Sequence, residues 1–495
     1  MRLGIDLGTT RTIVAVVDRG NYPVLQFEDP AGDAHDHVPS VVAWVDGALV
    51  TGYAALEAGR TRGVPVVRSF KRALGQPWVQ TCTPVDLGGT SLGLLEVLTG
   101  FLRDLRTSLL EHSTLAVGPD EPLEAAVAVP AHATGAQRFL TLQAFRDAGF
   151  DAVALLNEPS AAGFEYSHRH ARTITSKRTK VVVYDLGGGT FDASLVDLRG
   201  THHDVTATAG RPDLGGDDFD AVLAGLVADR AGLKADDPEL LEACRLAKER
   251  LTPQSKRLVV DLGEDLADVP VAEFYAAVTP LVHQTLDTVA PLLGDPDSES
   301  PELSEVAGIY LVGGGSALPL VPRLLRERFG RRVHSSLHPA ASTAIGLAIA
   351  ADDDSAYTIT DRLSRGFGVF REGHEGTEVI FDELVGRHQR VLEGDVVVTR
   401  RYRAAHNVGW FRFVEYVDLD ATGQPQGTIV PVAEFAFPFD RELQEGQSLA
   451  GEPVRRLEHG PEVEERYVVD PHGIVSVRIT DLDSGHTRSH SWGQR

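Results

Sequence analysis

The stretch VVVYDLGGGTFDASLVDL, residues 181–198, decides the fold of this chain. Two alternating hydrophobic runs, 180–185 and 191–198, predict a strand pair joined by a turn with three consecutive glycines. Glycines let the backbone come close to a ligand, and successive backbone N–H groups in such a turn form an anion site. Asp185, at the end of the first strand, could hold a hydrated Mg²⁺ that bridges to phosphate oxygens. The hydroxyl of Thr190 would add a further donor.

Two other glycine turns extend this pattern. LGIDLGTTRTIVAVV, residues 3–17, carries the same order of Asp-Leu-Gly, small residues and Thr between Asp6 and Thr10. The α/β part is therefore expected to be an internal duplication whose halves face each other. IYLVGGGSALP, residues 309–319, places a third turn between a strand and a helix, where N–H groups can meet a phosphate or a sugar. Each turn alone could be an ordinary loop, but the three together favour a nucleotide site.

Composition excludes several other classes of function. The net charge of −24 argues against a nucleic-acid partner. Cys82 and Cys244 are the only cysteines, so neither a disulfide framework nor a cysteine-based metal site is expected. No signal-peptide pattern opens the chain, and the longest weakly polar run, 340–351, is too short to cross a bilayer. We therefore expect a cytoplasmic protein without a membrane partner.

The order of strand and helix signals predicts two domains. Residues 1–351 alternate between strands and helices, as in α/β proteins, with a helix expected over 134–148. Residues 352–364 begin with three aspartates and predict an acidic linker. Residues 365–495 carry strand signals separated by Gly, Pro and Asp turns, which predicts an all-β, sandwich-like domain.

No P-loop sequence, no dinucleotide-binding G-x-G-x-x-G sequence and no nucleophile elbow are present. Three histidine pairs lack the neighbours of a metal site, so we expect them to be solvated residues of polar loops: His35 and His37, His168 and His170, His202 and His203.

Taken together, the three turns resemble those of the actin-like ATPase superfamily and, within it, of the 70-kDa heat-shock chaperones. Four further stretches are similar to segments of that family: VPVVRSFKRALGQ (64–76), VAVPAHATGAQRFLTLQAFRDAGF (127–150), LLNEPSAAGFEYS (155–167) and RPDLGGDDFD (211–220). The resemblance spans residues 2–351. It implies two duplicated lobes around a nucleotide cleft, with ATP or ADP bound together with Mg²⁺.

The resemblance also implies roles for individual residues. The catalytic group would be Lys71, Glu158, Asp185, Thr190 and Asp192. The nucleotide-binding group would be Gly8, Thr9, Thr10, Arg11, Gly187, Gly188, Gly189, Gly215, Gly216, Asp217, Lys248, Gly313, Gly314 and Gly315. Mg²⁺ would be held mostly through water by Asp6 and Asp185, with K⁺ as a second candidate ion. Coupling between the domains would involve Pro130 and Arg138.

Residue properties leave simpler alternatives open for some of these positions. Lys71 could be a solvated surface lysine. Pro130 could simply end a strand, and Arg138 could lie on a solvated helix face. Arg11 could neutralise phosphate or be solvated.

Three positions depart from the family pattern. Glu249 stands where some members carry an arginine that stacks on adenine, and Ala317 stands where another arginine usually lies. Loss of a stacked arginine removes about 0.5–2 kcal/mol, so we expect weaker ATP binding or a relaxed base preference. Ala154 stands where many members carry an arginine used by J-domain partners, which argues against dependence on such a partner.

The second domain resembles the family only in part. HNVGWFRFVEYVDL (406–419) and YVVDPHGIVSVRITDLDSG (467–485) are similar to strands of the family's β-sandwich. The segment TITDRLSRGFGV (358–369) lacks the leucine run of the family's linker, and no helical lid is expected because the sequence stops soon after these strands. Four aromatic residues are expected in the core of the sandwich rather than in a peptide site: Phe411, Phe413, Tyr416 and Phe437.

The function implied is that of a lidless ATP-hydrolysing chaperone, in which slow ATP turnover is coupled to polypeptide binding by the β domain. Its expected partners are a polypeptide client and a nucleotide-exchange factor. The alternative is a nucleotide-gated sensor with one dedicated protein partner. A metabolite kinase on the same fold is disfavoured by the Asn157-Glu158-Pro159 motif.

Overall fold

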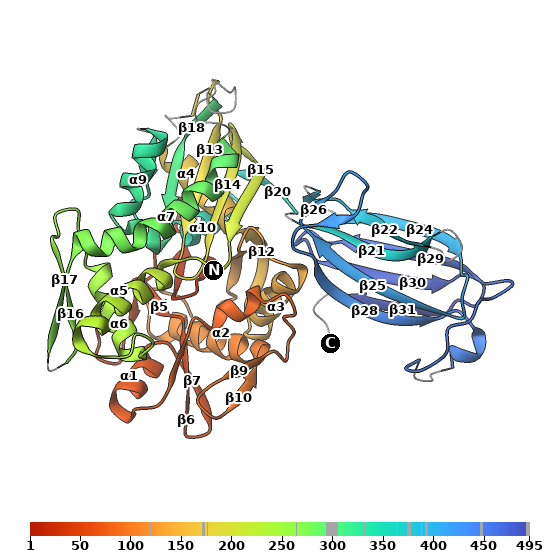
Figure 1. Cartoon of the computed structure of the whole chain (residues 1–495), viewed down its shortest axis with the longest axis horizontal. Helices are drawn as coiled ribbons and strands as arrows, with labels where there is room; N and C mark the ends of the chain where they lie inside the picture. Colours follow the sequence, from red (N-terminus) through yellow and green to blue (C-terminus); the bar gives the residue numbers. More distant parts are fainter. Residues whose placement is uncertain are drawn as a thin grey trace.

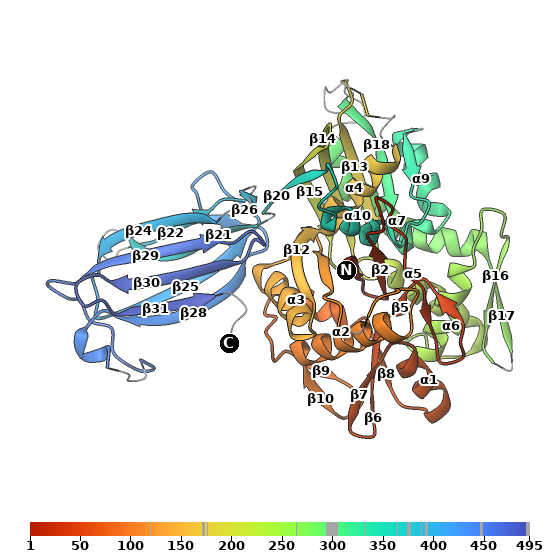
Figure 2. The ribbon, with the colours of Figure 1, turned by 180° about the vertical axis from the view of Figure 1, so that it is seen from behind.

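The computed structural model has a two-lobed α/β part followed by an all-β part, seen from opposite sides in Figures 1 and 2. It describes the whole chain except residues 119, 171–173, 176, 264, 294–304, 331, 364, 374–377, 388, 392–394, 446–448 and 492–495. The order of an α/β part and an all-β part confirms the predicted fold class.

Lobe I is built on a five-stranded sheet with a hairpin at its centre. The antiparallel hairpin β1–β2 is extended on the β1 side by two parallel strands. In spatial order the sheet consists of β12 (Asp151–Asn157), β11 (Glu124–Val129), β1 (Arg2–Leu7), β2 (Arg11–Val16) and β5 (Val38–Pro39). Apolar side chains of this sheet, such as Leu3 and Ile5, share one core with helices α2 (Leu94–Glu111) and α3 (Gly135–Asp147).

Lobe II repeats this arrangement. Its antiparallel hairpin β13–β14 is again extended by two parallel strands, so the order β19–β18–β13–β14 reproduces β12–β11–β1–β2. The sheet consists of β19 (Val333–Ser335), β18 (Val306–Val312), β13 (Lys180–Leu186), β14 (Phe191–Arg199), β15 (His202–Arg211), β20 (Thr358–Arg362) and β23 (Arg390–Val391). The shared order supports the predicted duplication of the two lobes.

Two helices in contact lie between the two sheets (Figure 1). Helix α10 (Ser342–Ala351) packs against the lobe I sheet, and α4 (Glu158–His170) packs against the lobe II sheet. They approach so closely that a Cβ at Gly346 would lie 1.8 Å from the carbonyl oxygen of Ala161. The two lobes therefore join through backbone packing that only glycine permits.

The remaining elements cover these sheets or extend from them. In lobe I they are β3 (Phe27–Glu28), β4 (Ala34–His35), β6 (Val41–Val45), β7 (Ala48–Thr51), α1 (Gly52–Arg62), β8 (Val66–Arg68), β9 (Pro84–Asp86) and β10 (Ser91–Gly93). In lobe II they are α5 (Gly216–Ala231), α6 (Pro238–Glu249), β16 (Arg257–Asp261), β17 (Leu266–Pro270), α7 (Val271–Leu293) and α9 (Leu320–Phe329). The predicted helix 134–148 is α3, which Thr134 caps by accepting a hydrogen bond from the backbone N–H of Gln137.

The segment expected to be a linker contains a β-strand. Residues 358–360 of β20 pair in parallel with residues 202–204 of β15, at the edge of the lobe II sheet. The connection between the two parts is therefore attached to lobe II through backbone hydrogen bonds. The three acidic residues that predicted a linker, Asp352 to Asp354, lie just before this strand. The acidic composition therefore gave no indication of the strand itself.

The all-β part is a sandwich of two four-stranded sheets. One sheet consists of β22 (Glu378–Val385), β21 (Gly366–Gly373), β25 (Val408–Tyr416) and β28 (Val430–Pro438). The other consists of β24 (Val396–Arg403), β29 (Glu462–Val469), β30 (Val475–Asp481) and β31 (Thr487–Ser491). A short ribbon consists of β26 (Asp418–Leu419) and β27 (Pro425–Gln426). The four aromatic residues expected in the core are all buried.

The sandwich docks on lobe I beside α3. The backbone N–H of Gly135, at the first turn of α3, donates a hydrogen bond of 2.8 Å to Oε1 of Glu415 on β25. Arg138 donates through Nη1 to the carbonyl oxygen of His472, in the turn between β29 and β30. Ile474 of the same turn belongs to the hydrophobic core of lobe I. The two parts are thus joined by apolar and polar contacts in addition to the chain connection.

The prediction for the histidine pairs was wrong in two cases. His203 is fully buried in β15, its ring centroid 4.8 Å from that of Phe164, and burial lowers its pKa to about 4. His168 and His170 lie on α4.

None of the helices in the described part of the chain is both long and apolar enough to cross a bilayer. The cytoplasmic location stays a prediction.

Candidate functional site

The turns of the two central hairpins face each other between the lobes. A Cβ added to Gly188, in lobe II, would lie 2.6 Å from Cγ2 of Thr10, in lobe I. A Cβ at Gly189 would lie 2.8 Å from Cγ2 of Thr9. The glycines therefore allow an approach between the lobes that any side chain would block.

The remaining glycine turns pack against the turn of lobe II. The backbone N–H groups of Gly216 and Asp217 donate hydrogen bonds of 2.9 and 2.7 Å to the carbonyl oxygens of Gly187 and Gly188. Gly313 adopts φ +80°, and a Cβ there would lie 2.3 Å from Oδ1 of Asp185. Three segments far apart in the sequence thus form one wall.

These turns enclose a cavity of about 390 Å³. Most of the predicted site residues line it: Asp6, Gly8, Thr9, Thr10, Arg11, Lys71, Glu158, Asp185, Gly187, Gly188, Thr190, Gly216, Asp217, Lys248, Gly313, Gly314 and Gly315. Three predicted residues, Gly189, Gly215 and Asp192, are not among the residues that line it. Gly215 packs directly behind the wall, where a Cβ would lie 2.5 Å from the carbonyl oxygen of Gly188.

Lys71 is buried in this cavity and paired with a carboxylate. Its Nζ lies 2.8 Å from Oε1 of Glu158, and the side chains are only 7% and 11% exposed. Burial lowers the pKa of Lys71, but the carboxylates of Glu158 and Asp6 outweigh this effect and raise it. Lys71 is therefore a fixed positive charge inside the cavity, and the alternative of a solvated surface lysine is wrong.

Three aspartates lie near this cation: Asp185 and Asp192 are buried, and Asp6 is partly exposed. Burial and then the charge of Glu158 raise the pKa of Asp6 to about 7 and that of Asp192 to about 8. The same two causes raise the pKa of Asp185 well above its ordinary value. Four acidic side chains, those of Asp6, Glu158, Asp185 and Asp192, thus lie close to the single cation of Lys71 and repel one another when ionised. Carboxylate oxygens of this kind suit a divalent cation, which would relieve their repulsion.

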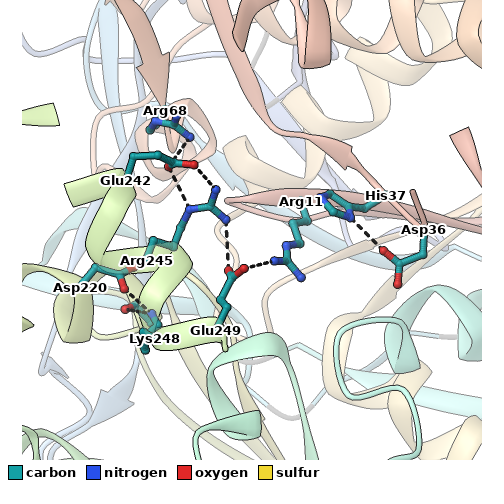
Figure 3. A network of polar contacts seen from close by, with 10 residues as sticks. Arg11, Asp36, His37, Arg68, Asp220, Glu242, Arg245, Lys248 and Glu249 are labelled. Atoms are coloured by element: carbon teal, nitrogen blue, oxygen red, sulfur yellow. Dashed lines mark hydrogen bonds and ion pairs between the residues drawn. The ribbon is translucent and has the colours of Figure 1, made fainter. Parts of the chain in front are cut away.

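An ion-pair network crosses the cavity entrance between the lobes (Figure 3). Nη2 of Arg11, from the lobe I turn, lies 2.5 Å from Oε2 of Glu249 on α6. Glu249 also pairs with Arg245 at 3.1 Å, and Arg245 pairs with Glu242. Glu242 in turn lies 3.1 Å from Arg68 of lobe I. Arg11 is therefore neither solvated nor free, and two ion pairs of this network, Arg11–Glu249 and Arg68–Glu242, connect the lobes.

The opposite wall holds the predicted lysine in place. Nζ of Lys248 donates to the carbonyl oxygen of Gly216 at 2.7 Å and lies 2.7 Å from Oδ1 of Asp220. Ala317 lines the cavity, as do Leu251 and Leu318. At position 317, where the resemblance implies an arginine in other members, this chain thus presents a methyl group beside Leu318.

Several residues at this site escaped the sequence analysis. Arg245 and Asp220 line the cavity, and Arg72 donates to the carbonyl oxygen of Gly189 at 3.2 Å while lying 3.6 Å from Asp217. Arg72 directly follows Lys71, which the family resemblance had singled out. This position in the sequence could have identified Arg72 as a site residue. Arg245 offered no comparable signal, because a charged helix residue usually indicates a solvated face.

The expected coupling residues lie between the cavity and the sandwich. Pro130 follows β11, and Arg138 on α3 is buried rather than solvated. Nη2 of Arg138 donates to Oδ1 of Asn157 at 2.5 Å, and Asn157 precedes Glu158 in the sequence. Arg138 also reaches the sandwich through His472. A continuous set of contacts therefore runs from Glu158 to the all-β part.

This arrangement can bind and polarise a polyphosphate. Facing backbone turns and threonine hydroxyls provide hydrogen-bond donors for phosphate oxygens, and Lys71 provides a charge at the developing negative centre. The carboxylates can hold a hydrated cation.

Comparison with known proteins gives a consistent family assignment. The family model described as Hsp70 protein matches residues 2–87 and 109–359. The chain is 34% identical over 365 residues to a protein named chaperone protein HscA homolog from Tolumonas auensis. It is 35% identical over 373 residues to the HscA homolog of Pseudomonas fluorescens and 35% identical over 366 residues to chaperone protein HscA of Klebsiella pneumoniae. These alignments cover 70–71% of this chain and 57% of each relative, so the chain spans less than two thirds of the relatives' length.

Proposed function

Because this chain belongs to the Hsp70 family, whose members are ATPases, we propose that it hydrolyses ATP and couples the nucleotide state to polypeptide binding by its sandwich. The observation that carries this proposal is the pair of facing turns, Thr9–Thr10 and Gly188–Gly189, around a cavity that contains the buried Lys71.

In this proposal each part of the cavity has one task. The N–H groups of the glycine turns, with the hydroxyls of Thr9, Thr10 and Thr190, bind the β- and γ-phosphates. Asp6 and Asp185 would hold Mg²⁺ mostly through water, and the ion would supply charge neutralisation at the phosphates. Lys71 stabilises charge on the γ-phosphate.

Hydrolysis then depends on the position of the attacking water. Glu158 is fixed by its bond to Lys71, so its carboxylate can orient a water in line with the γ-phosphate, and Asp192 supports it. No covalent intermediate is required. Turnover is expected to be slow, because positioning without an arginine finger leaves much of the barrier.

The sandwich is proposed to bind extended polypeptide at a sheet edge. β22 is an edge strand of its sheet, and Val379 and Ile380 on it are exposed. Strand addition would satisfy the free backbone groups of such an edge. The aromatic residues of the core are not available for this contact, because they are buried.

The test is single-turnover release of γ-phosphate, with and without an excess of a mixed peptide library. We expect Mg²⁺-dependent release that peptides accelerate, and almost none with Lys71→Ala. Release of γ-phosphate that peptides do not change would support ATP hydrolysis but contradict its coupling to polypeptide binding. Exchange of K⁺ for Na⁺ in the same assay tests the second candidate ion. The alternative of a dedicated sensor is not favoured, because the relatives are named chaperones.

A further inference from the structure

The outer face of the sheet β24–β29–β30–β31 carries two arginines directly opposite each other. Arg466 on β29 pairs in register with Arg478 on β30, and both side chains are exposed. Like charges in this position repel each other and destabilise a sheet. Neither arginine makes an ion pair or a side-chain hydrogen bond with any residue that the structure describes.

Hydroxyl groups surround this arginine pair. Along the same row, Thr399 on β24 lies opposite Arg466, and Ser489 on β31 lies opposite Arg478. Ser476 and Thr480 flank Arg478 two residues away on the same face, because side chains alternate along a strand. The face therefore presents two guanidinium groups surrounded by hydroxyl groups that can donate hydrogen bonds.

The carboxylate nearest to Arg466 on this face of β29 is already neutralised. Glu464, two residues before Arg466, is bound by Arg401, whose Nε lies 2.7 Å from its Oε2. The central rows of the face thus keep a positive charge, although the chain as a whole carries −24. A local positive charge on an otherwise acidic protein attracts an anionic partner.

We propose that this outer face is a docking surface for an acidic segment of another polypeptide. Two carboxylates spaced along an extended chain can each accept paired hydrogen bonds from one guanidinium, and the hydroxyls can donate to the remaining oxygens. A carboxylate-rich polypeptide is favoured over a nucleic acid, because the outward rows of these four strands carry no aromatic side chain on which a base could stack.

This face stays accessible when the sandwich is docked. The contacts with lobe I come from β25 and from the turn between β29 and β30, through Glu415, His472 and Ile474. Figure 2 shows the sheet β24–β29–β30–β31 beside the α/β part, with lobe I lying toward its end. The proposed partner can therefore bind whether or not a nucleotide is present, independently of the proposed ATPase.

The test is fluorescence anisotropy of a dye-labelled decamer of glutamate with the full chain at low salt. The variant Arg466→Gln/Arg478→Gln should bind the decamer at least about tenfold more weakly. The matched control Arg19→Gln/Arg412→Gln removes the same charge at exposed positions elsewhere and should bind within about twofold of the wild type.

Two further readouts complete the test. Because the variant removes a repulsive pair, its melting temperature should equal or exceed that of the wild type, so that lost binding cannot be attributed to unfolding. Equal affinity of the wild type and the arginine variant for the decamer would overturn the proposal. So would tighter binding of a ten-nucleotide oligothymidylate than of the glutamate decamer. ATP turnover without peptide should be unchanged in the variant, which separates this inference from the proposed function.

Discussion

Glu415 of the sandwich accepts a hydrogen bond of 2.8 Å from the backbone N–H of Gly135, a residue 280 positions earlier. This contact places a carboxylate at the first turn of α3, where the helix dipole favours negative charge. Burial nevertheless raises the pKa of Glu415, against the opposing effects of the Gly135 N–H, Arg365 and Arg138. The interface between the two parts therefore contains a carboxyl group that takes up a proton more readily than an ordinary glutamate.

Docking of the sandwich should therefore strengthen as the pH falls. A raised pKa gives a contribution to stability that is complete below the ordinary pKa of glutamate and lost as the pH rises through the raised value. Energy transfer between dyes on the exposed Cys82 and on an introduced Ser484→Cys would report docking, since Cys244 is buried. We expect transfer to increase from pH 8 to pH 5 in the wild type.

Glu415→Gln keeps an acceptor for Gly135 but cannot titrate, so its energy transfer should no longer increase as the pH falls. Burial lowers the pKa of His472 at the same interface, so docking of this variant should weaken rather than strengthen at low pH. Glu442→Gln, at an exposed position of the sandwich, is the matched control and should follow the wild type. An unchanged pH dependence in Glu415→Gln would contradict the assignment of the effect to this carboxyl.

Removal of the positive charge of Lys71 should affect both the stability of the protein and its ATP turnover. Lys71→Met leaves Glu158 buried without its partner, which costs about 3–5 kcal/mol of the free energy of unfolding. Release of γ-phosphate should fall at least about 100-fold. Denaturant unfolding should show partial recovery of stability in Lys71→Met/Glu158→Gln, while turnover stays low. Lys234→Met, at an exposed lysine, should leave both quantities unchanged.

The ion pair at the cavity entrance should slow the release of a bound nucleotide. Arg11 and Glu249 come from different lobes, so their contact must break when the lobes separate. Glu249→Gln should therefore raise the dissociation rate of fluorescent ADP about two- to fivefold, the range of a partly exposed pair. Glu57→Gln breaks a comparable pair with Arg60 inside α1 and should have no effect. Identical rates in the two variants would show that the contact does not restrain the lobes.

A methyl group in the wall of the cavity should separate the lobes. The Cβ of Gly188→Ala would lie 2.6 Å from Thr10, so the two turns cannot keep their spacing. Calorimetry should show ADP affinity reduced by at least about tenfold, because the turns no longer face a phosphate together. Gly225→Ala in α5 is the matched control, since nothing lies within 4 Å of its Cβ. It should bind ADP normally and gain up to about 1 kcal/mol of helix stability.

The sequence was sufficient to predict the parts of the site that depend on local backbone geometry. The Asp-Leu-Gly turns and the third glycine turn were predictable, because a close backbone approach to a ligand restricts the residues that are allowed. The position of Lys71 followed only from the family resemblance of residues 64–76. The repeated order of motifs also indicated the duplicated lobes. Each turn can be identified within a few residues, whereas the duplication rests on the recurrence of the same turn at Asp6 and Asp185.

Contacts between distant side chains were not predictable in the same way. Arg11 and Glu249 are individually ordinary charged residues, and only the approach of two lobes makes them partners. Glu415 lies in the alternating strand VGWFRFVEY, where a charged residue normally indicates an exposed position, yet docking on α3 buries it. The strand β20 was missed because its pairing partner, β15, lies about 150 residues away.

The pairing of β20 with β15 limits how far the sandwich can move away from lobe II. While residues 358–360 are bonded to β15, short segments of chain link the sheet of lobe II to the sandwich, between Arg362 and Gly366 and on either side of β23. Release of this five-residue strand would lengthen the tether by about 17 Å when fully extended. The sandwich would then explore a larger volume, and its effective concentration at the α3 surface would fall. A few backbone hydrogen bonds at a sheet edge can thus govern re-docking without any change in the docking surfaces themselves.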